Sequence, residues 1–384
     1  LRRGNLPMPY NLTGFRGMIS GEVHSGNDRF PECPGTPYRT RLFLFRQRRA
    51  DMIFWIPVNE YILEFESLED IRFPELPGSA FRGVFGTCLR CECCISRGQE
   101  CHRCQLLRVC PYNIIFERAI PADGDNVIRD DTAKPYIFET VNLSRQFARK
   151  GELFSIRVKL FGTDPTYTKY IIKAMMAAGR RGVNADRKRF RLIRVAQSSC
   201  NGIFTVYQRG DNHELDIRDC HLRIECPNEA SEIQVIIPEN MPLILKARCP
   251  ELRNKRGVAI SPEAFTARKF LTTAVRRTLS LYDHYGRKKD PSGKGLLPFN
   301  TRPENELIEL ARGIELSDTE LFQKTCTRYS NRSREKTSLP GFYGQFTLKG
   351  ELTPFIPYLW FCAVCHLGSY SIMGLGGFGI RRVR

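Results

Sequence analysis

The chain has 384 residues and carries 59 Lys and Arg against 41 Asp and Glu, a formal net charge of +18. This excess of cations favours nucleic acid over an anionic membrane surface as the partner, because neutralised phosphates release their counterions. The sequence contains no run of about 18 apolar residues that could span a bilayer, and it shows no secretion signal. We therefore expect a cytoplasmic protein with no membrane partner.

Residues 1–51 differ from the rest of the chain, because they are rich in Arg, Gly and Pro and lack sustained periodicity. Two explanations stay open: a disordered or non-native leader, or an ordinary N-terminal arm. At about 150 residues per domain, the remaining chain is long enough for two domains.

From Met52 onward the pattern becomes regular. Strands and helices are predicted in the order β-α-β-β-α-β at 52–68, 77–94, 134–141, 151–162, 164–182 and 189–197. This is the ferredoxin-like arrangement, which RNA-recognition domains also use. The order recurs more loosely as strand, helix, strand, helix and strand at 232–247, 261–286, 341–352, 353–368 and 377–384.

We therefore predict an α+β protein with two tandem ferredoxin-like domains. The first covers 52–200 and the second 231–384, with a linker over 201–230. Another stretch, about 287–340, is irregular and polar.

The fifteen cysteines are concentrated, since seven lie between Cys88 and Cys110. Clustered cysteines in a chain without a secretion signal indicate metal binding rather than disulfide bonds. Four of them have the spacing C-x6-C-x2-C-x5-C: Cys94, Cys101, Cys104 and Cys110. Four thiolates suit a structural zinc in a Cys-rich insertion over 88–112, an iron–sulfur cluster being the less favoured occupant. Cys88, Cys91 or Cys93 could replace Cys94, His102 could replace one thiolate, and free thiols without metal are the plainer alternative.

Residues 179–194 hold seven cations and one acid, with Phe190 between them. Cations beside an aromatic ring suit single-stranded or hairpin RNA, whereas a solvated loop is the ordinary alternative. The candidate RNA contacts in this run are Arg180, Arg181, Arg187, Lys188, Arg189 and Arg191.

Near the end of the chain, four glycines fall between positions 374 and 379 and are followed by two arginines. Because glycine has no Cβ, such a loop can bring backbone N–H groups close to a phosphate. A tight turn chosen for its geometry is the alternative. The candidate RNA contacts here are Ser369, Gly374, Gly376, Gly377, Gly379, Arg381 and Arg382.

Five segments together resemble the CRISPR-associated endoribonucleases of the RAMP superfamily that cut precursor CRISPR RNA. They are "LPGSAFRGVFGTCLR" (76–90), "CPYNIIFE" (110–117), "RYSNRS" (328–333), "GFYGQFTLKG" (341–350) and "HLGSYSIMGLGGFGI" (366–380). The resemblance covers about residues 55–384. It implies two ferredoxin-like domains, a C-terminal glycine-rich loop that grips RNA, and cleavage within each CRISPR repeat.

Two features depart from that family. Ser369 stands where the family loop has a lysine, and the predicted helix 78–94 contains no histidine that could serve as the base. Both put catalysis in doubt more than RNA binding.

Cleavage of RNA needs no metal, because the 2′-hydroxyl can attack the adjacent phosphate. The products are a 2′,3′-cyclic phosphate and a 5′-hydroxyl. A histidine suits the general base, and we expect His366 first and His284 second, with Tyr285 as a proton donor. Looser candidates for RNA contact are Arg82, Arg332 and Arg334.

The leading hypothesis is thus a metal-independent endoribonuclease that acts on CRISPR repeat RNA, retains its product and has no small-molecule substrate. One alternative is a non-catalytic RAMP subunit that holds CRISPR RNA together with other subunits of an effector complex. Another is a zinc-containing RNA-binding protein of other purpose.

Overall fold

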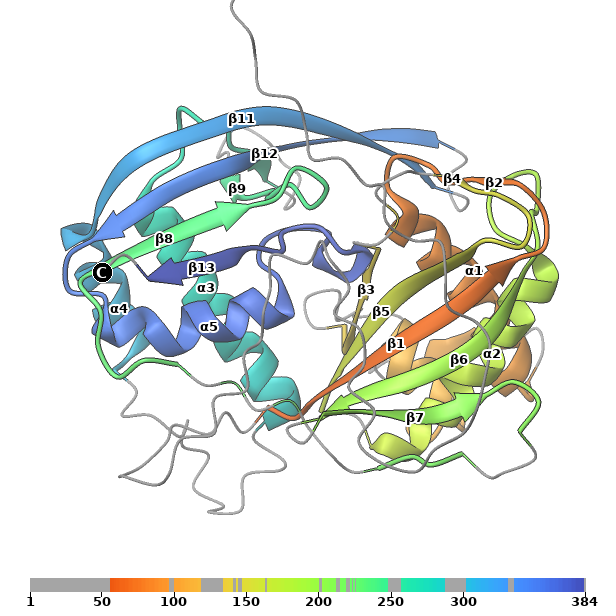
Figure 1. Cartoon of the computed structure of the whole chain (residues 1–384). Coiled ribbons are helices and arrows are strands. Elements are labelled where there is room, and N and C mark those ends of the chain that lie inside the picture. Colours follow the sequence, from red (N-terminus) through yellow and green to blue (C-terminus); the bar gives the residue numbers. More distant parts are fainter. Residues whose placement is uncertain are drawn as a thin grey trace, which may run out of the picture. The chain divides into compact units, whose positions relative to one another are not determined.

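The computed structural model of the chain is shown in Figure 1. It describes residues 56–96, 100–118, 134–140, 143, 147–162, 164–199, 202–211, 215–218, 222, 224, 226–247, 257–286, 302–330 and 335–382. The leader expected over 1–51 lies outside the described residues.

The N-terminal domain has the predicted ferredoxin-like order. Its elements are β1 (Val58–Ser67), α1 (Pro77–Cys93), β3 (Tyr136–Glu139), β5 (Leu153–Phe161), α2 (Thr168–Arg181) and β6 (Phe190–Ser199). They form an antiparallel sheet in the order β3-β5-β1-β6-β7. The last strand is β7 (Gly202–Gln208), which pairs with β6. It lies within the predicted linker 201–230, so the sheet of the N-terminal domain continues beyond residue 200.

The alternation of β1 explains which face of this sheet is covered. Tyr61, Leu63 and Phe65 are buried in the core. The ring of Phe65 lies 6.3 Å from that of Phe81 on α1 and 5.1 Å from that of Phe190 on β6. Burying such rings supplies most of the favourable free energy of the domain.

The C-terminal domain repeats the same topology. Its elements are β8 (Glu232–Ile237), α3 (Ala267–Leu281), α4 (Glu304–Leu310), β11 (Glu315–Ser330), β12 (Glu335–Lys349), α5 (Ile356–Cys365) and β13 (Gly379–Arg382). The sheet order is β11-β12-β8-β13, with all described pairs antiparallel. Both domains are therefore ferredoxin-like, as predicted.

The expectation of an irregular stretch over 287–340 is wrong for β11 and α4. Strand β11 lies at the edge of its sheet and, within the described ranges, pairs with β12 alone. Among its described side chains only Cys326 is buried. Without a buried face, its sequence lacks the apolar alternation by which a strand is predicted.

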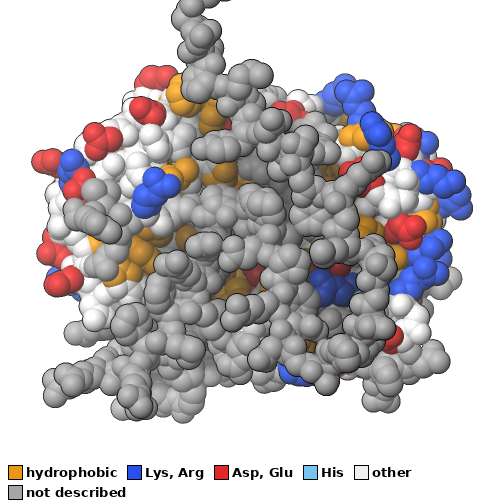
Figure 2. Space-filling view, in the orientation of Figure 1, with side chains coloured by type: hydrophobic (Ala, Val, Ile, Leu, Met, Phe, Trp, Pro, Cys, Tyr) orange, Lys and Arg blue, Asp and Glu red, His pale blue; other side chains and the backbone are white. Residues whose placement is uncertain are grey.

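Two short strand pairs complete the described structure. Strand β2 (Ile71–Arg72) pairs with β4 (Phe147–Ala148), and β9 (Lys246–Ala247) pairs with β10 (Val258–Ala259). Lys and Arg side chains gather at the end of the N-terminal domain where β2 and β4 lie (Figure 2). No helix in the described part of the chain has the length and apolar content needed to cross a membrane.

Candidate nucleic-acid interface

The glycine-rich loop packs against protein. Gly374, Gly376 and Gly377 are buried. A Cβ on Gly376 would lie 1.8 Å from the carbonyl oxygen of Leu367, and one on Gly374 would lie 2.6 Å from that of Phe138 in β3. Both glycines have positive φ, +71° and +89°. Gly374 therefore permits close contact between the loop and β3 of the N-terminal domain, whereas Gly376 permits close packing within the loop itself. These glycines pack on protein, and their contact with RNA stays a prediction.

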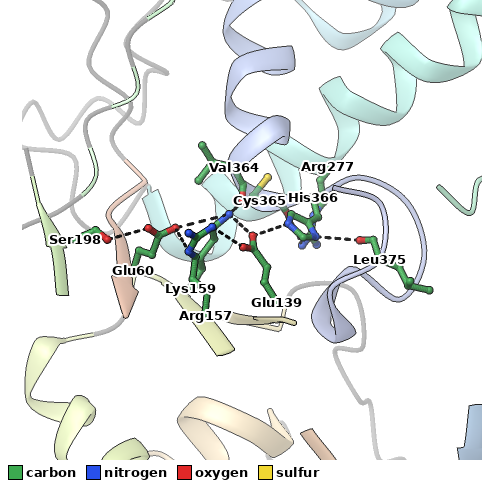
Figure 3. Close-up of polar contacts among 10 residues, drawn as sticks. All are labelled: Glu60, Glu139, Arg157, Lys159, Ser198, Arg277, Val364, Cys365, His366 and Leu375. Carbon is green, nitrogen blue, oxygen red and sulfur yellow. Dashed lines mark hydrogen bonds and ion pairs between the residues drawn. The ribbon is translucent and has the colours of Figure 1, made fainter. Parts of the chain in front are cut away.

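His366 lies at the beginning of this loop and is 2% exposed. Its Nε2 is 2.7 Å from Oε1 of Glu139, and its Nδ1 is 3.1 Å from the carbonyl oxygen of Leu375 (Figure 3). Burial lowers the pKa of the ring, although the hydrogen bond and charge of Glu139 oppose this. The ring is thus buried and bonded on both nitrogens in this structure, and its role as a general base stays a prediction.

Glu139 joins this histidine to further charges of the N-terminal domain. Its carboxylate accepts hydrogen bonds from Lys159 and, at 3.2 Å, from Arg157, both on β5. Lys159 also donates to the carbonyl of Val364 in α5 at 2.9 Å. These contacts form the interdomain network: Glu139, Arg157, Lys159, Val364, His366 and Leu375 (Figure 3).

Electrostatics favour the ionised form of this network. Burial alone would raise the pKa of Glu139, but Lys159, His366 and Arg157 together hold that pKa well below its ordinary value. The carboxylate is consequently charged at neutral pH and ties the glycine-rich loop to β3 and β5.

His284 and Tyr285, the second catalytic candidates, lie at the end of α3. Nδ1 of His284 is 2.7 Å from the carbonyl oxygen of Ser280. Tyr285 is buried, and its Cβ would be 2.4 Å from a Cβ placed on Gly162. Tyr285 thus packs closely against Gly162, and its part as a proton donor stays a prediction.

A second meeting point of the two domains carries cations. Its core consists of apolar residues from the start of α1, from β11 and β12, from the segment before β9 and from the glycine-rich loop: Leu76, Ile244, Cys326, Leu339, Met373 and Leu375. The carboxylate of Glu75 also accepts a hydrogen bond from the backbone N–H of Thr327 in β11, at 2.9 Å. These contacts bring side chains of α1, β11 and the loop together.

Arg82 of α1 and Arg328 of β11 lie close enough for their charges to interact. Burial lowers the pKa of Arg328, the charge of Arg82 lowers it further, and Tyr370 opposes both effects. The Nε of Arg328 is buried and has no hydrogen-bond partner in the described structure. A desolvated cation beside a second cation, without a carboxylate partner among the described residues, is poised to bind an anion.

Aromatic groups hold the neighbouring cations. Arg82 donates from Nε to the hydroxyl of Tyr136 at 3.1 Å and lies over the ring of Phe116 at 4.6 Å. The Nζ of Lys246 lies 5.4 Å from the ring centroid of Tyr370. We call the set Arg82, Lys246, Arg328 and Tyr370 the Arg82–Arg328 site.

Sequence reasoning found this site only in part. Arg82 was a loose candidate, while Arg328, Lys246 and Tyr370 were missed. Arg328 is the first residue of the segment 328–333, which carries part of the family resemblance. The RNA contacts predicted in and after that segment are Arg332 and Arg334 instead, and both lie outside the described residues. Ser369, beside Tyr370, is partly buried and donates its N–H to the carbonyl of Ile244 at 2.9 Å.

The structure divides the basic run 179–194 into two groups. Arg189, Arg191 and Arg194 form ion pairs with carboxylates of the N-terminal sheet region, at 3.2, 3.5 and 2.7 Å. Arg180, Arg181, Arg187 and Lys188 form no ion pair with the described residues. Farther along, Gly379 and Arg381 lie on β13, where Arg381 is exposed, whereas the side chain of Arg382 lies outside the description.

The cysteine-rich segment follows α1. Cys94, Cys101, Cys104 and Cys110 are partly exposed and unpaired in disulfides. Burial, with the nearby Cys110, raises the pKa of the Cys93 thiol to about 12. Among the described residues, no group of three or more His, Cys, Asp or Glu is arranged to hold a metal. Zinc at these cysteines stays a prediction.

Comparison with known proteins identifies related families. A family model described as CRISPR-associated endoribonuclease Cas6 matches residues 241–378, and one named AF_1859_N, described as an N-terminal domain, matches residues 56–219. No curated protein matches the chain.

Solved structures are also similar to this chain. "Cas6 (TTHB231) product complex" has 15% identity and a TM-score of 0.47, and the match covers 85% of this chain and 99% of that one. "An RAMP protein binding different RNA substrates" has 8% identity and a TM-score of 0.42, with 84% and 100% covered.

We predict that Glu139→Gln destabilises the protein by about 3 kcal/mol, because it removes the nearer carboxylate of the buried Lys159 and leaves Glu60, at 4.0 Å, as the remaining one. Urea unfolding at neutral pH measures the loss, and Glu315→Gln, which removes an exposed carboxylate at the start of β11, is the control. The folded-state pKa of Glu139 is lowered, so its contribution is present above the ordinary value of 4.5 and is lost as the pH falls below it. Equal stability of Glu139→Gln and wild type would contradict the role of the network.

Metal analysis of purified protein tests the cysteine prediction. We expect about one equivalent of zinc per chain and its loss in a Cys101→Ser/Cys104→Ser variant. The control is Cys362→Ser, which changes a buried thiol of α5. Less than about half an equivalent of either zinc or iron would leave the cysteines as free thiols.

Proposed function

We propose, from the premise that the chain is a Cas6-like protein of the CRISPR repeat-processing class, that it cleaves precursor CRISPR RNA at the Arg82–Arg328 site. The premise rests on the match of residues 241–378 to the Cas6 family model. One observation carries the choice of site: the Nε of Arg328 is buried and has no hydrogen-bond partner in the described structure, while the nearby charge of Arg82 adds to the demand for an anion. A phosphodiester would supply the missing anion.

The reaction proposed here uses the nucleophile of the RNA itself. The 2′-oxygen loses its proton and forms a bond to the adjacent phosphorus, while the bond from phosphorus to the 5′-oxygen breaks. The 5′-oxygen then takes up a proton, which gives a 2′,3′-cyclic phosphate and a 5′-hydroxyl. These bond changes and proton transfers do not require a metal ion.

Arg82 and Arg328 would stabilise the negative charge that grows on the phosphorane oxygens. Donors fixed in advance and partly desolvated are effective in this task, because they need no reorganisation during the reaction. Arg82 is held by Tyr136 and Phe116, so its guanidinium is positioned before RNA binds.

Tyr370 is the candidate for proton transfer. It follows Ser369 in the loop and adopts a left-handed backbone, with φ of +65°. Tyr370 packs against the apolar cluster that contains Cys326 of β11, two residues before Arg328, and a tyrosine hydroxyl can donate or accept a proton. In this account the buried glycines and His366 act indirectly, because they fix the loop that carries Tyr370.

A second candidate function is binding without cleavage, as in a RAMP subunit that holds CRISPR RNA within an effector complex. The observation in its favour is that His366 is buried and bonded on both nitrogens. In addition, helix α1 contains no histidine. Under this alternative the same arginines bind the phosphate but no bond breaks.

We predict that Arg328→Gln slows cleavage by about 100- to 1,000-fold. Single-turnover cutting of a hairpin repeat RNA in EDTA measures the rate. The melting temperature should stay unchanged or rise, because the substitution removes a desolvated cation that repels Arg82. Arg381→Gln, which removes an exposed cation from β13, is the control.

A wild-type cleavage rate for Arg328→Gln would refute this site. Tight binding of the repeat by wild type without any cutting would instead support the binding-only function.

Tyr370→Phe separates chemistry from binding. We expect cleavage to fall by about 100-fold or more, with RNA affinity little changed, because the ring that lies near Lys246 is kept. The control is Tyr329→Phe, an exposed tyrosine on β11. If both variants cut at the same rate as wild type, Tyr370 takes no chemical part.

A further inference from the structure

A second cationic surface lies at the end of the N-terminal domain and is separate from the Arg82–Arg328 site. We call it the basic edge and define it by Arg72, Arg149, Lys150, Arg187 and Lys188. Four of these side chains are exposed and Lys188 is partly buried. They come from three segments: β2, the turn after β4, and the turn between α2 and β6.

Backbone contacts hold these three segments together. Arg72 pairs with Phe147 in the ladder of β2 and β4. The side chain of Asn184 donates to the backbone carbonyl of Arg72 at 2.7 Å, and the N–H of Lys150 donates to Asp70 at 2.8 Å. The cations are therefore grouped by the fold, although they are far apart in the sequence.

The basic edge differs from the neighbouring cations in being unpaired. None of its five side chains forms an ion pair with a residue in the described ranges. Arg189, Arg191 and Arg194, by contrast, are each matched by a carboxylate. Unpaired, exposed cations gathered on one surface favour a polyanion, since they neutralise its charge without losing an existing ion pair.

An aromatic ring lies among these cations. Phe147 is 42% exposed and lines a hollow together with Arg149, Lys150 and Glu152. An exposed ring beside cations is the combination that binds unpaired bases, because the base stacks on the ring while the cations contact the phosphates.

The basic edge lies close to the proposed cleavage site along the chain. Arg72 and Glu75 are separated by three residues, so their Cα atoms are at most about 11 Å apart. Glu75 in turn bonds the backbone of Thr327, the residue before Arg328. One RNA molecule can thus contact both surfaces within a few nucleotides.

We propose that the basic edge binds a single-stranded stretch of the same RNA, next to the repeat segment held at the Arg82–Arg328 site, with an unpaired base stacked on Phe147. This inference rests on the proposed function. It assigns the recognition of nucleotides away from the cleaved bond to a surface other than the Arg82–Arg328 site.

The test compares two triple variants of equal net charge. Arg149→Gln/Lys150→Gln/Arg187→Gln removes unpaired cations of the basic edge, and Arg189→Gln/Arg191→Gln/Arg194→Gln removes paired ones. Affinity is measured against salt concentration for two RNAs, a bare repeat hairpin and the same hairpin with a single-stranded flank.

For the flanked RNA we expect the first variant to lower the slope of log affinity against log salt by about 2, the value for three phosphate contacts to a single strand. The second variant should keep the wild-type slope. Phe147→Leu should weaken binding of the flanked RNA by about fivefold or more and leave the hairpin unaffected. Because Phe147→Leu is a single change at an exposed position, it still tests the basic edge if the triple variant fails to fold.

Wild-type affinity and slope for the basic-edge variant and for Phe147→Leu would overturn the inference, and would direct attention to a protein partner for this surface. The proposed function would then still stand, since the hairpin would remain bound and cut. If wild type bound neither RNA, the proposed function and this inference would fail together.

Discussion

The buried carboxylate of Glu139 is the constraint on which the arrangement of this protein depends. It is 3% exposed and accepts hydrogen bonds from β5 of its own domain and from His366 of the other domain. A charge buried in this way is costly unless every partner is in place, so the network penalises any shift of one domain against the other. The glycine-rich loop follows His366 directly and is fixed along with it.

The fixed loop has a consequence for the cationic site. Because the loop is held against β3 and α1, Tyr370 is carried to the meeting point of α1 and β11, where Arg82 and Arg328 lie. The interdomain network fixes the position of the loop, while the two arginines are the groups that an RNA phosphate would contact in the proposed function. The buried network, which joins opposite charges, and the two arginines, which repel each other, thus lie at the same domain boundary.

The division of charges extends to the surface. The open face of the N-terminal sheet matches Arg191 and Arg194 on β6 to Glu66 and Glu64 on β1. Such exposed pairs contribute little to stability, but they remove those cations from the set that can bind a polyanion. The cations of the basic edge form no ion pair with the described residues, so in the proposed account the distribution of carboxylates decides where RNA binds.

The sequence by itself determined both ferredoxin-like repeats, because aromatic and β-branched alternation and helical spacing are local signals that need no knowledge of distant residues. It also indicated an RNA partner through net charge. It could not show that Gly376 packs on Leu367 or that His366 bonds Glu139, since these residues meet only after both domains have folded. Nor could it find β11, whose exposed edge position leaves no apolar pattern. Burial and charge pairing depend on which distant segments become neighbours, and for that reason only the tertiary structure showed that His366 is buried and bonded whereas Arg149 and Arg187 are exposed.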